Sequence, residues 1–330
     1  MVLTAANPLT PGLLERYRLR ARKLLRPGMI GAHRTRRKGQ SLEFREFQRY
    51  ARGDDIRHVD WRASARFGGK DDLLVRSFSA EEQLTLVISL DTRSSMLLPE
   101  ALPKLQAALW TAQALGTIAL RSSDRVVLHR LFGPAAGSVA ELAGTASASA
   151  LSPTLKRLAG PAGGGETERS PRPPAHDQDP PSNLRLLGRL LPPAGVWLIL
   201  TDLYFESQET VQALGRKIAA AQDGLRWVIL VDLDSWPHEK ALLGRGARRI
   251  EGLRRREDDP RVELDEPALR QVEERIRSHK KRLRSQLRRS GLDWLHWTYP
   301  ARSQFDAAGF FRRRFLDDPV LERLFMREAR

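Results

Sequence analysis

The chain has 330 residues, of which 41% are hydrophobic and 29% charged, so it can bury a large core in one domain or two smaller ones. It contains no cysteine, which excludes disulfides and thiolate metal sites and fits a reducing compartment. The formal net charge of +16 would attract nucleic acid, anionic lipid or an acidic protein.

The beginning of the chain lacks a charged leader followed by an apolar block, so we expect no signal peptide. The longest apolar stretch, residues 105–120, includes Gln106 and Gln113. It is shorter than the roughly 20 residues that a membrane-spanning helix requires. We therefore expect a soluble, cytoplasmic protein without a transmembrane segment.

Hydrophobic periodicity predicts strands and helices that alternate along the chain. The predicted helices are residues 11–25, 102–120, 152–158, 206–221, 266–289 and 318–327. The predicted strands are residues 72–78, 83–90, 125–132, 195–201, 225–231 and 292–298. Such alternation is typical of an α/β fold with a mostly parallel sheet and helices on both faces.

A change of composition interrupts this pattern. Residues 161–182 are rich in Gly, Pro and charged residues and contain too few apolar side chains to order themselves, so we predict a disordered insertion there. We assign residues 71–330 to the α/β domain, because strands and helices resume after the insertion. Residues 1–70 are predicted to form a helix and a polar block that pack on the sheet.

Two basic runs account for much of the charge. Residues 16–38 contain ten Lys or Arg residues and no acid, and residues 270–289 are similarly rich in basic side chains. One interpretation is that both runs are solvated helix faces. The alternative is a nucleic-acid-binding protein that uses these runs, although no aromatic residues alternate with the basic ones to stack on bases.

Polar residues follow two predicted strands where each strand ends. Asp91 comes directly after residues 83–90, with Ser94 and Ser95 close behind it, and Asp202 follows residues 195–201. Ligands of parallel sheets bind beyond the carboxyl ends of the strands. Carboxylates and hydroxyls there would suit Mg²⁺.

A third loop could complete such a site with a hydroxyl from Thr167 or Ser182. Ser182 is the easier of the two to place, because only a short helix separates it from the strand that precedes Asp202. The alternative is that Asp91 and Asp202 cap the helices that follow them.

The polar block at residues 39–68 mixes arginines, acids and aromatic residues. One interpretation is an irregular segment locked onto the sheet edge by Arg–carboxylate pairs. The other is a docking surface, because Trp, Tyr and Arg are frequent hot-spot residues. The candidate docking residues are Arg49, Tyr50, Asp54, Asp55, Arg57, Asp60, Trp61 and Arg66.

The same block resembles the signature of the family called domain of unknown function 58. The matching residues are Glu43, Phe44, Arg49, Tyr50, Gly53, Asp54, Asp55, Arg57, Asp60, Trp61, Ser64, Ala65 and Arg66. The segments 90–96 and 200–203 are similar to the metal-dependent adhesion site of von Willebrand factor A domains. The resemblance extends from about residue 14 to the end of the chain and is weakest at residues 133–183.

The resemblance implies a Rossmann-like von Willebrand A fold and a non-enzymatic protein that works with an AAA+ ATPase of the MoxR type. It also implies a metal site at Asp91, Ser95, Ser182 and Asp202. This site is degenerate, because Arg93 stands where the adhesion-site pattern has a serine ligand. We expect weak Mg²⁺ binding at most, and no other cofactor.

Arg93 has two possible placements: it replaces the metal between the carboxylates, or it turns outward. Arg93, Ser94 and Thr167 are also candidates for binding a partner protein.

Enzyme signatures are missing from the sequence. It contains neither a Walker A motif nor a G-x-S-x-G motif, and its seven histidines show no metal-ligand spacing. A metal-dependent hydrolase using Asp91 and Asp202 is the third alternative, and it lacks a visible general base.

Overall fold

The computed structural model describes residues 6–19, 42–50, 56–67, 73–80, 84–132, 137–160, 183–184, 186, 195–205, 208–223, 226–243, 248–250, 262–288 and 292–327. The chain divides into two compact units, one formed by Met1–Pro27 with Leu84–Arg330 and the other by Gly28–Gln83. Packing of residues 1–70 on the sheet stays a prediction. The insertion predicted at residues 161–182 lies outside the described residues.

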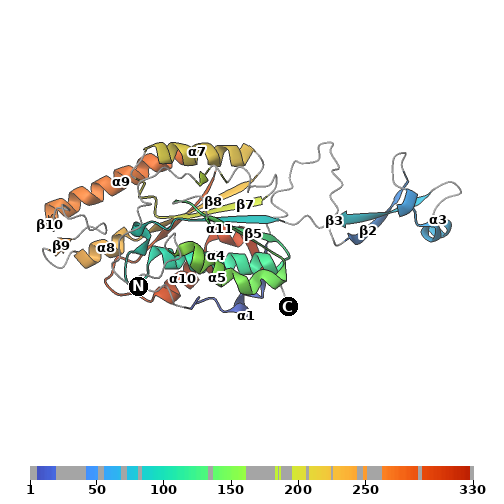
Figure 1. Cartoon of the computed structure of the whole chain (residues 1–330), viewed down its shortest axis with the longest axis horizontal. Helices are drawn as coiled ribbons and strands as arrows, with labels where there is room; N and C mark the ends of the chain where they lie inside the picture. Colours follow the sequence, from blue (N-terminus) through green and yellow to red (C-terminus); the bar gives the residue numbers. More distant parts are fainter. Residues whose placement is uncertain are drawn as a thin grey trace. The chain divides into compact units, whose positions relative to one another are not determined.

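The larger unit is built on a six-stranded sheet (Figure 1). Its strands lie in the order β11-β8-β7-β4-β5-β6, and every pair is parallel except β5 with β6. The predicted mostly parallel sheet is therefore confirmed. The strands are β4 (Thr85–Leu90), β5 (Arg125–Arg130), β6 (Val139–Ala143), β7 (Gly195–Thr201), β8 (Trp227–Asp234) and β11 (Asp293–Thr298).

Helices cover both faces of this sheet, because alternate residues of its central strands are apolar on both sides. Ile88 and Leu198 belong to a core shared with one group of helices, and Val87 and Trp197 to a core shared with the other. The first group is α4 (Lys104–Arg121), α5 (Ala148–Ala159), α10 (Ala307–Leu316) and α11 (Pro319–Leu324). The second is α7 (Gln208–Asp223) and α9 (Glu266–Arg288).

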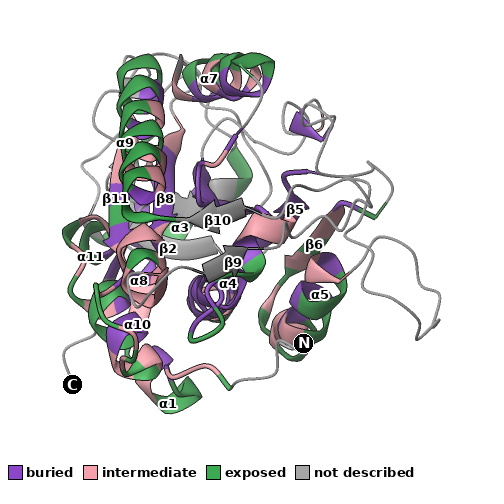
Figure 2. Cartoon of the chain, turned by 90° about the vertical axis from the view of Figure 1, so that its left-hand side faces the viewer, coloured by how far each residue is buried: buried purple, intermediate pink, exposed green. Residues whose placement is uncertain are grey.

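Helix α4 is the central helix of the larger unit. It is buried along most of its length, as its purple colour in Figure 2 shows. Its sequence is apolar on all sides, which is typical of a fully buried helix. None of the described helices is long and apolar enough to cross a membrane.

The two ends of the larger unit differ from the prediction. Helix α1 (Pro11–Leu14) is a single turn, and β1 (Tyr17–Leu19) pairs antiparallel with β12 (Phe325–Arg327). The predicted helices at residues 11–25 and 318–327 are therefore wrong over these strand segments. This pairing joins residues some 300 positions apart, so local periodicity cannot reveal it. Tyr17 and Phe325 pack edge to face across it, with ring centroids 5.2 Å apart.

The remaining elements of the larger unit are short. They are η2 (Ser94–Leu97), η3 (Thr145–Ser147), α8 (Trp236–Leu243), β9 (Arg248–Ile250) and β10 (Val262–Leu264). The sequence analysis did not predict them, nor did it predict β6 and α10.

The smaller unit contains the polar block, and the described residues of that block lie mostly in regular elements, which differs from the interpretation as an irregular segment. Strands β2 (Leu42–Arg49) and β3 (Leu74–Ala80) form an antiparallel pair with a register shift between Phe44 and Glu46. Between them lie η1 (Ile56–His58) and α3 (Trp61–Phe67). Asp60 caps α3, because its Oδ1 accepts a hydrogen bond of 2.9 Å from the Ala63 N–H.

We expect Phe311→Ala to lower the free energy of unfolding by about 3–5 kcal/mol, measured by chemical denaturation. The Phe311 side chain is fully buried, and its ring centroid lies 5.1 Å from that of Trp110 and 6.0 Å from that of Trp297. It therefore joins α10 to both α4 and β11. The control is Leu97→Ala, because Leu97 is exposed and its truncation should change stability by less than about 1 kcal/mol. Equal effects of the two substitutions would contradict this prediction.

Candidate functional site

Asp91 and Asp202 lie at the carboxyl ends of β4 and β7, which are neighbours at the centre of the sheet. The chain passes from β4 to β5 on one side and later places β7 and β8 on the other. The two aspartates therefore occupy the topological switch point, where α/β sheets bind ligands. Both side chains are fully buried, so their charges must be compensated within the protein.

Arg93 compensates both carboxylates. Its Nη2 lies 2.6 Å from Asp91 Oδ2 and 3.1 Å from Asp202 Oδ1, and its Nε donates to Asp91 Oδ1 at 3.0 Å. Of the two placements considered for Arg93, the structure has the inward one. The guanidinium takes the position between the carboxylates that a divalent cation would need.

Three further groups hold the Arg93 guanidinium in place. Nη1 donates to the Tyr204 carbonyl oxygen at 2.7 Å. The guanidinium carbon lies 4.5 Å from the ring centroid of Phe132 and 5.0 Å from that of Phe205, within cation–π range. The planar fork of arginine suits this combination of bidentate pairing and stacking, which lysine could not reproduce.

Lys104, the first residue of α4, supplies a second cation. Its Nζ lies 3.1 Å from Asp202 Oδ2 and 3.9 Å from a carboxylate oxygen of Glu239. The same Nζ is 4.8 Å from the ring centroid of Tyr204. The Lys104 side chain is only 2% exposed, so it is committed to the site. The sequence analysis missed Lys104, although a lone lysine at the start of an apolar helix is a signal for a buried ion pair.

These charges set the protonation of Asp202. Burial alone would raise its pKa, but Lys104 and Arg93 outweigh burial. Together with the Tyr204 N–H and the Ser95 side chain they lower the pKa of Asp202 to about 2. The Asp202 carboxylate therefore stays ionised at neutral pH.

The backbone at the end of β7 is turned sharply by this site. Asp202 Oδ1 accepts from the Tyr204 N–H at 3.0 Å, and Asp91 Oδ1 accepts from the Arg93 N–H at 3.1 Å. Leu203 has a φ of +62°, a left-handed conformation that non-glycine residues rarely adopt. Asp202 precedes α7 by six residues and Asp91 precedes α4 by thirteen. The two aspartates therefore hold turns at strand ends, and the alternative that they cap these helices is wrong.

As the site stands, its residues do not fit a metal ion. A divalent cation between Asp91 and Asp202 would meet the guanidinium of Arg93 and the ammonium of Lys104. Across the described part of the chain, no three His, Asp or Glu side chains gather to hold a metal. Ser94 and Ser95 lie beside the site in η2, whereas Thr167 and Ser182 lie outside the described residues.

The docking residues predicted in the polar block belong to the smaller unit. Asp60 serves as the cap of α3. Asp54 and Asp55 lie outside the described residues. The exposed ones are Arg49, Tyr50, Arg57, Trp61 and Arg66. The apolar residues Phe47 and Ile56 are exposed there as well, and the sequence analysis did not select them for docking.

The buried histidine of β5 has a structural role. His129 Nδ1 lies 2.9 Å from the Ser89 hydroxyl, and its Nε2 lies 3.1 Å from the Asn183 carbonyl oxygen. Trp197 donates to the same hydroxyl at 2.8 Å. Burial lowers the pKa of His129 to about 4, so the ring is neutral at pH 7. His129 is therefore a core residue whose ring nitrogens both have hydrogen-bonding partners.

The fold and the site define an α/β protein with a mostly parallel sheet and a buried acidic pair at its switch point. The chain belongs to the family described as "Protein of unknown function DUF58", whose model matches residues 45–282. A comparison with curated proteins found no match.

We expect Lys104→Met to lower the free energy of unfolding by about 3–5 kcal/mol at pH 7, because it leaves Asp202 buried with one cation fewer. The low pKa of Asp202 means that its ionised form stabilises the fold above pH 3.8, and that this contribution is lost as the pH falls toward 2. The difference between the variant and the unsubstituted protein should therefore shrink over that interval.

Chemical denaturation at pH 7 and at a series of lower pH values would measure this. The matched control is Lys240→Met, which breaks a more exposed pair with Glu273 and should cost no more than about 1 kcal/mol. A difference that stays constant down to pH 2 would show that Lys104 acts through packing rather than through its charge.

We expect Arg93→Ser to increase the affinity for Mg²⁺, measured by isothermal titration calorimetry. The substitution removes the guanidinium from both carboxylates and introduces a hydroxyl that can ligate the ion. Arg121→Ser is the control, since Arg121 forms an exposed pair with Glu15. No gain for Arg93→Ser would show that Arg93 is not what excludes the ion.

Proposed function

We propose that the protein is a non-enzymatic protein–protein interaction module and that the smaller unit supplies its main docking surface. The observation that supports this most directly is the exposure of large apolar side chains on that unit. Trp61 is 62% exposed and Ile56 is 60% exposed. Phe47 and Tyr50, which precede them in the sequence, are exposed as well. Exposed apolar groups of this kind mark interaction sites on soluble domains.

The chemistry of this surface indicates the kind of partner. Trp, Tyr and Arg are the residues that contribute most often to interface hot spots. The smaller unit exposes all three types, with arginines at positions 49, 57, 62 and 66. We therefore infer a partner that offers an apolar pocket for Trp61 and Ile56 with an acidic rim around it.

The non-enzymatic part of the proposal rests on the closed acidic pair. Asp91 accepts hydrogen bonds from Arg93 and from the Thr201 hydroxyl at 2.8 Å, and Asp202 is paired with Arg93 and Lys104. Neither carboxylate has the open position that a catalytic acid or a metal-activated water would need, and the pKa of Asp202 is lowered by Lys104 and Arg93 although burial would raise it. We infer that the pair stabilises the end of the sheet and presents a fixed surface.

The finer identity rests on the resemblance of the sequence. The segments 90–96 and 200–203 resemble the adhesion site of von Willebrand factor A domains, and the parallel sheet with helices on both faces is consistent with that fold. We propose that the partner is an AAA+ ATPase of the MoxR type and that the chain acts as its adaptor. This link depends on the family resemblance.

Trp61→Ala should abolish most of the retention of the partner in a tagged pull-down from the native cell with Mg²⁺ and ATP present. Removing an exposed hot-spot tryptophan is expected to cost about 2 kcal/mol or more of binding free energy. The melting temperature should stay within about 2 °C, because the side chain is exposed.

The matched control is Leu97→Ala, which truncates an exposed apolar residue of the larger unit that is not part of the proposed docking surface. Retention of an AAA+ ATPase at moderate salt by the unsubstituted protein and by this control would support the proposal. Recovery of nucleic acid that is lost as salt rises, with no stoichiometric protein, would instead favour the basic runs as the functional surface.

A further inference from the structure

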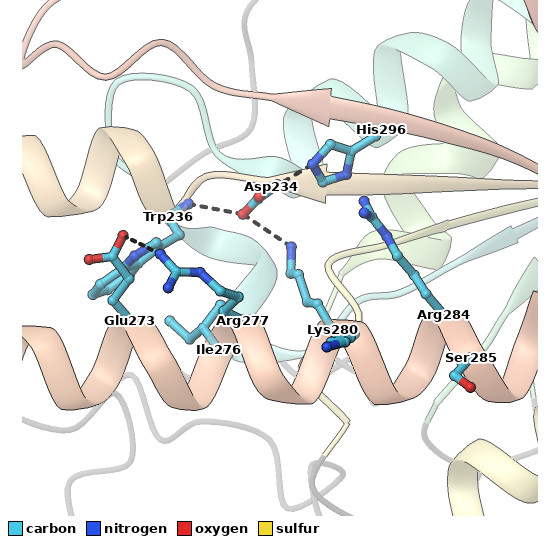
Figure 3. A pocket seen from close by; sticks show the side chains of 10 residues that line it. Asp234, Trp236, Glu273, Ile276, Arg277, Lys280, Arg284, Ser285 and His296 are labelled. Atoms are coloured by element: carbon cyan, nitrogen blue, oxygen red, sulfur yellow. Dashed lines mark hydrogen bonds and ion pairs between the residues drawn. The ribbon is translucent and has the colours of Figure 1, made fainter.

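We propose that a pocket beside the carboxyl ends of β8 and β11 binds a small organic anion through its carboxylate or phosphate group. The pocket has a volume of about 810 Å³ and lies between these strands, α8 and α9 (Figure 3). Small-molecule sites commonly measure about 300–1,000 Å³ and lie beyond the carboxyl ends of parallel strands. This goes beyond the proposed docking function, because it uses residues of the larger unit alone.

The position of the pocket follows from the closed site described above. The crevice at the switch point between β4 and β7 is filled by Arg93 and Lys104. An open space lies further along this edge of the sheet, at β8 and β11. Tyr204 separates the two places, because its ring faces Lys104 at 4.8 Å and Lys280 at 5.3 Å.

One face of α9 gives the pocket its basic wall. Arg277, Lys280, Lys281 and Arg284 follow the i, i+3, i+4, i+7 spacing of a single helix face, and all four line the pocket. A helix that packs on a sheet normally turns apolar residues inward. Helix α9 does so with Leu283 and Leu287, whereas this stripe turns toward the open space.

The acidic groups of the pocket are already engaged. Lys280 Nζ lies 3.0 Å from Asp232 Oδ1 and 3.0 Å from Asp234 Oδ1, and His296 Nδ1 lies 2.8 Å from Asp232 Oδ2. Glu273 pairs with Lys240 at 2.6 Å and with Arg277 at 3.4 Å. The carboxylates therefore use Lys280, Lys240 and Arg277 as counter-charges.

Two cations of the basic wall keep donors for a ligand. Lys281 makes no ion pair among the described residues. Arg284 approaches Asp232 only to 4.0 Å, and its side chain is 48% exposed. Ammonium and guanidinium groups are donors only, so what binds them must accept hydrogen bonds and carry negative charge. A carboxylate or a phosphate meets both conditions.

Two apolar residues beside the basic wall favour an organic body for this anion. Trp236 at the start of α8 and Ile276 on α9 both line the pocket and give it an apolar surface. A bare inorganic ion would leave that surface in contact with water. An anion that carries a planar or apolar group would cover this surface, and the burial of apolar area would strengthen binding beyond the ionic contacts.

The experiment is isothermal titration calorimetry of the full chain at low salt with two matched pairs of probes. Adenosine monophosphate is compared with adenosine, and indole-3-acetate with its uncharged alcohol, tryptophol. We expect one anion to bind with a Kd of about 1 mM or tighter and its uncharged counterpart to bind at least tenfold more weakly. The pair that responds identifies phosphate or carboxylate as the recognised group.

The double variant Lys281→Gln/Arg284→Gln should weaken binding of that anion by tenfold or more, since each charge-assisted hydrogen bond is worth about that factor. The matched control is Arg282→Gln, which removes an exposed positive charge next to Lys281 that does not line the pocket, and its effect should be less than about twofold. A thermal melt of each variant checks folding, and Lys281→Gln alone replaces the double variant if that one is unfolded.

Three outcomes would overturn the proposal. They are no binding of either anion at low salt, equal binding of the charged and uncharged probes, and equal loss in the double variant and in Arg282→Gln. If neither small anion binds but a glutamate-rich peptide does, the basic wall is assigned to a protein partner. None of these results bears on the smaller unit, so the pocket and the docking surface can fail separately.

Discussion

Two carboxylates buried at the ends of adjacent central strands are the constraint around which the larger unit is arranged. Unpaired ions in that position would cost several kcal/mol each, so the fold must bring cations to them. Arg93 and Lys104 do this from the loop after β4 and from the start of α4. The turn after β7, with Leu203 at positive φ, brings the Tyr204 carbonyl and the Phe205 ring to the same guanidinium.

That arrangement determines where a ligand can bind at this edge of the sheet. Ligand sites in parallel sheets depend on an open crevice at the switch point, and here protein side chains close it. An open space lies past Tyr204, where two further aspartates, Asp232 and Asp234, both pair with one lysine, Lys280. The difference between the two places lies in the cations. Among the described residues, Arg93 and Lys104 at the first place both pair with its acids, whereas the second also has Lys281, which forms no ion pair there, and Arg284, which comes only within 4.0 Å of Asp232.

The sequence was most informative where structure depends on local pattern. The continuous apolar runs of β4, β7 and β8 predicted buried central strands within a few residues, because burial on both faces leaves no polar position. The pairing of β1 with β12 was not predicted, because the two strands are far apart in the sequence and come together only in the folded chain. The strand ends located Asp91 and Asp202, but Lys104 was missed because its partner Asp202 lies far away in the sequence and the lysine alone does not identify it.

The smaller unit differs, because several of its large apolar side chains are exposed, namely Phe47, Tyr50, Ile56 and Trp61. Burying such groups is worth about 25 cal/mol for each Å² removed from water, so Trp61 and Ile56 forgo that stabilisation in the isolated chain. A partner that covers them restores it. The flanking arginines then govern the rate and the choice of partner, since rim charges act mainly on association and specificity. Salt should therefore slow formation of the complex more than it speeds its dissociation.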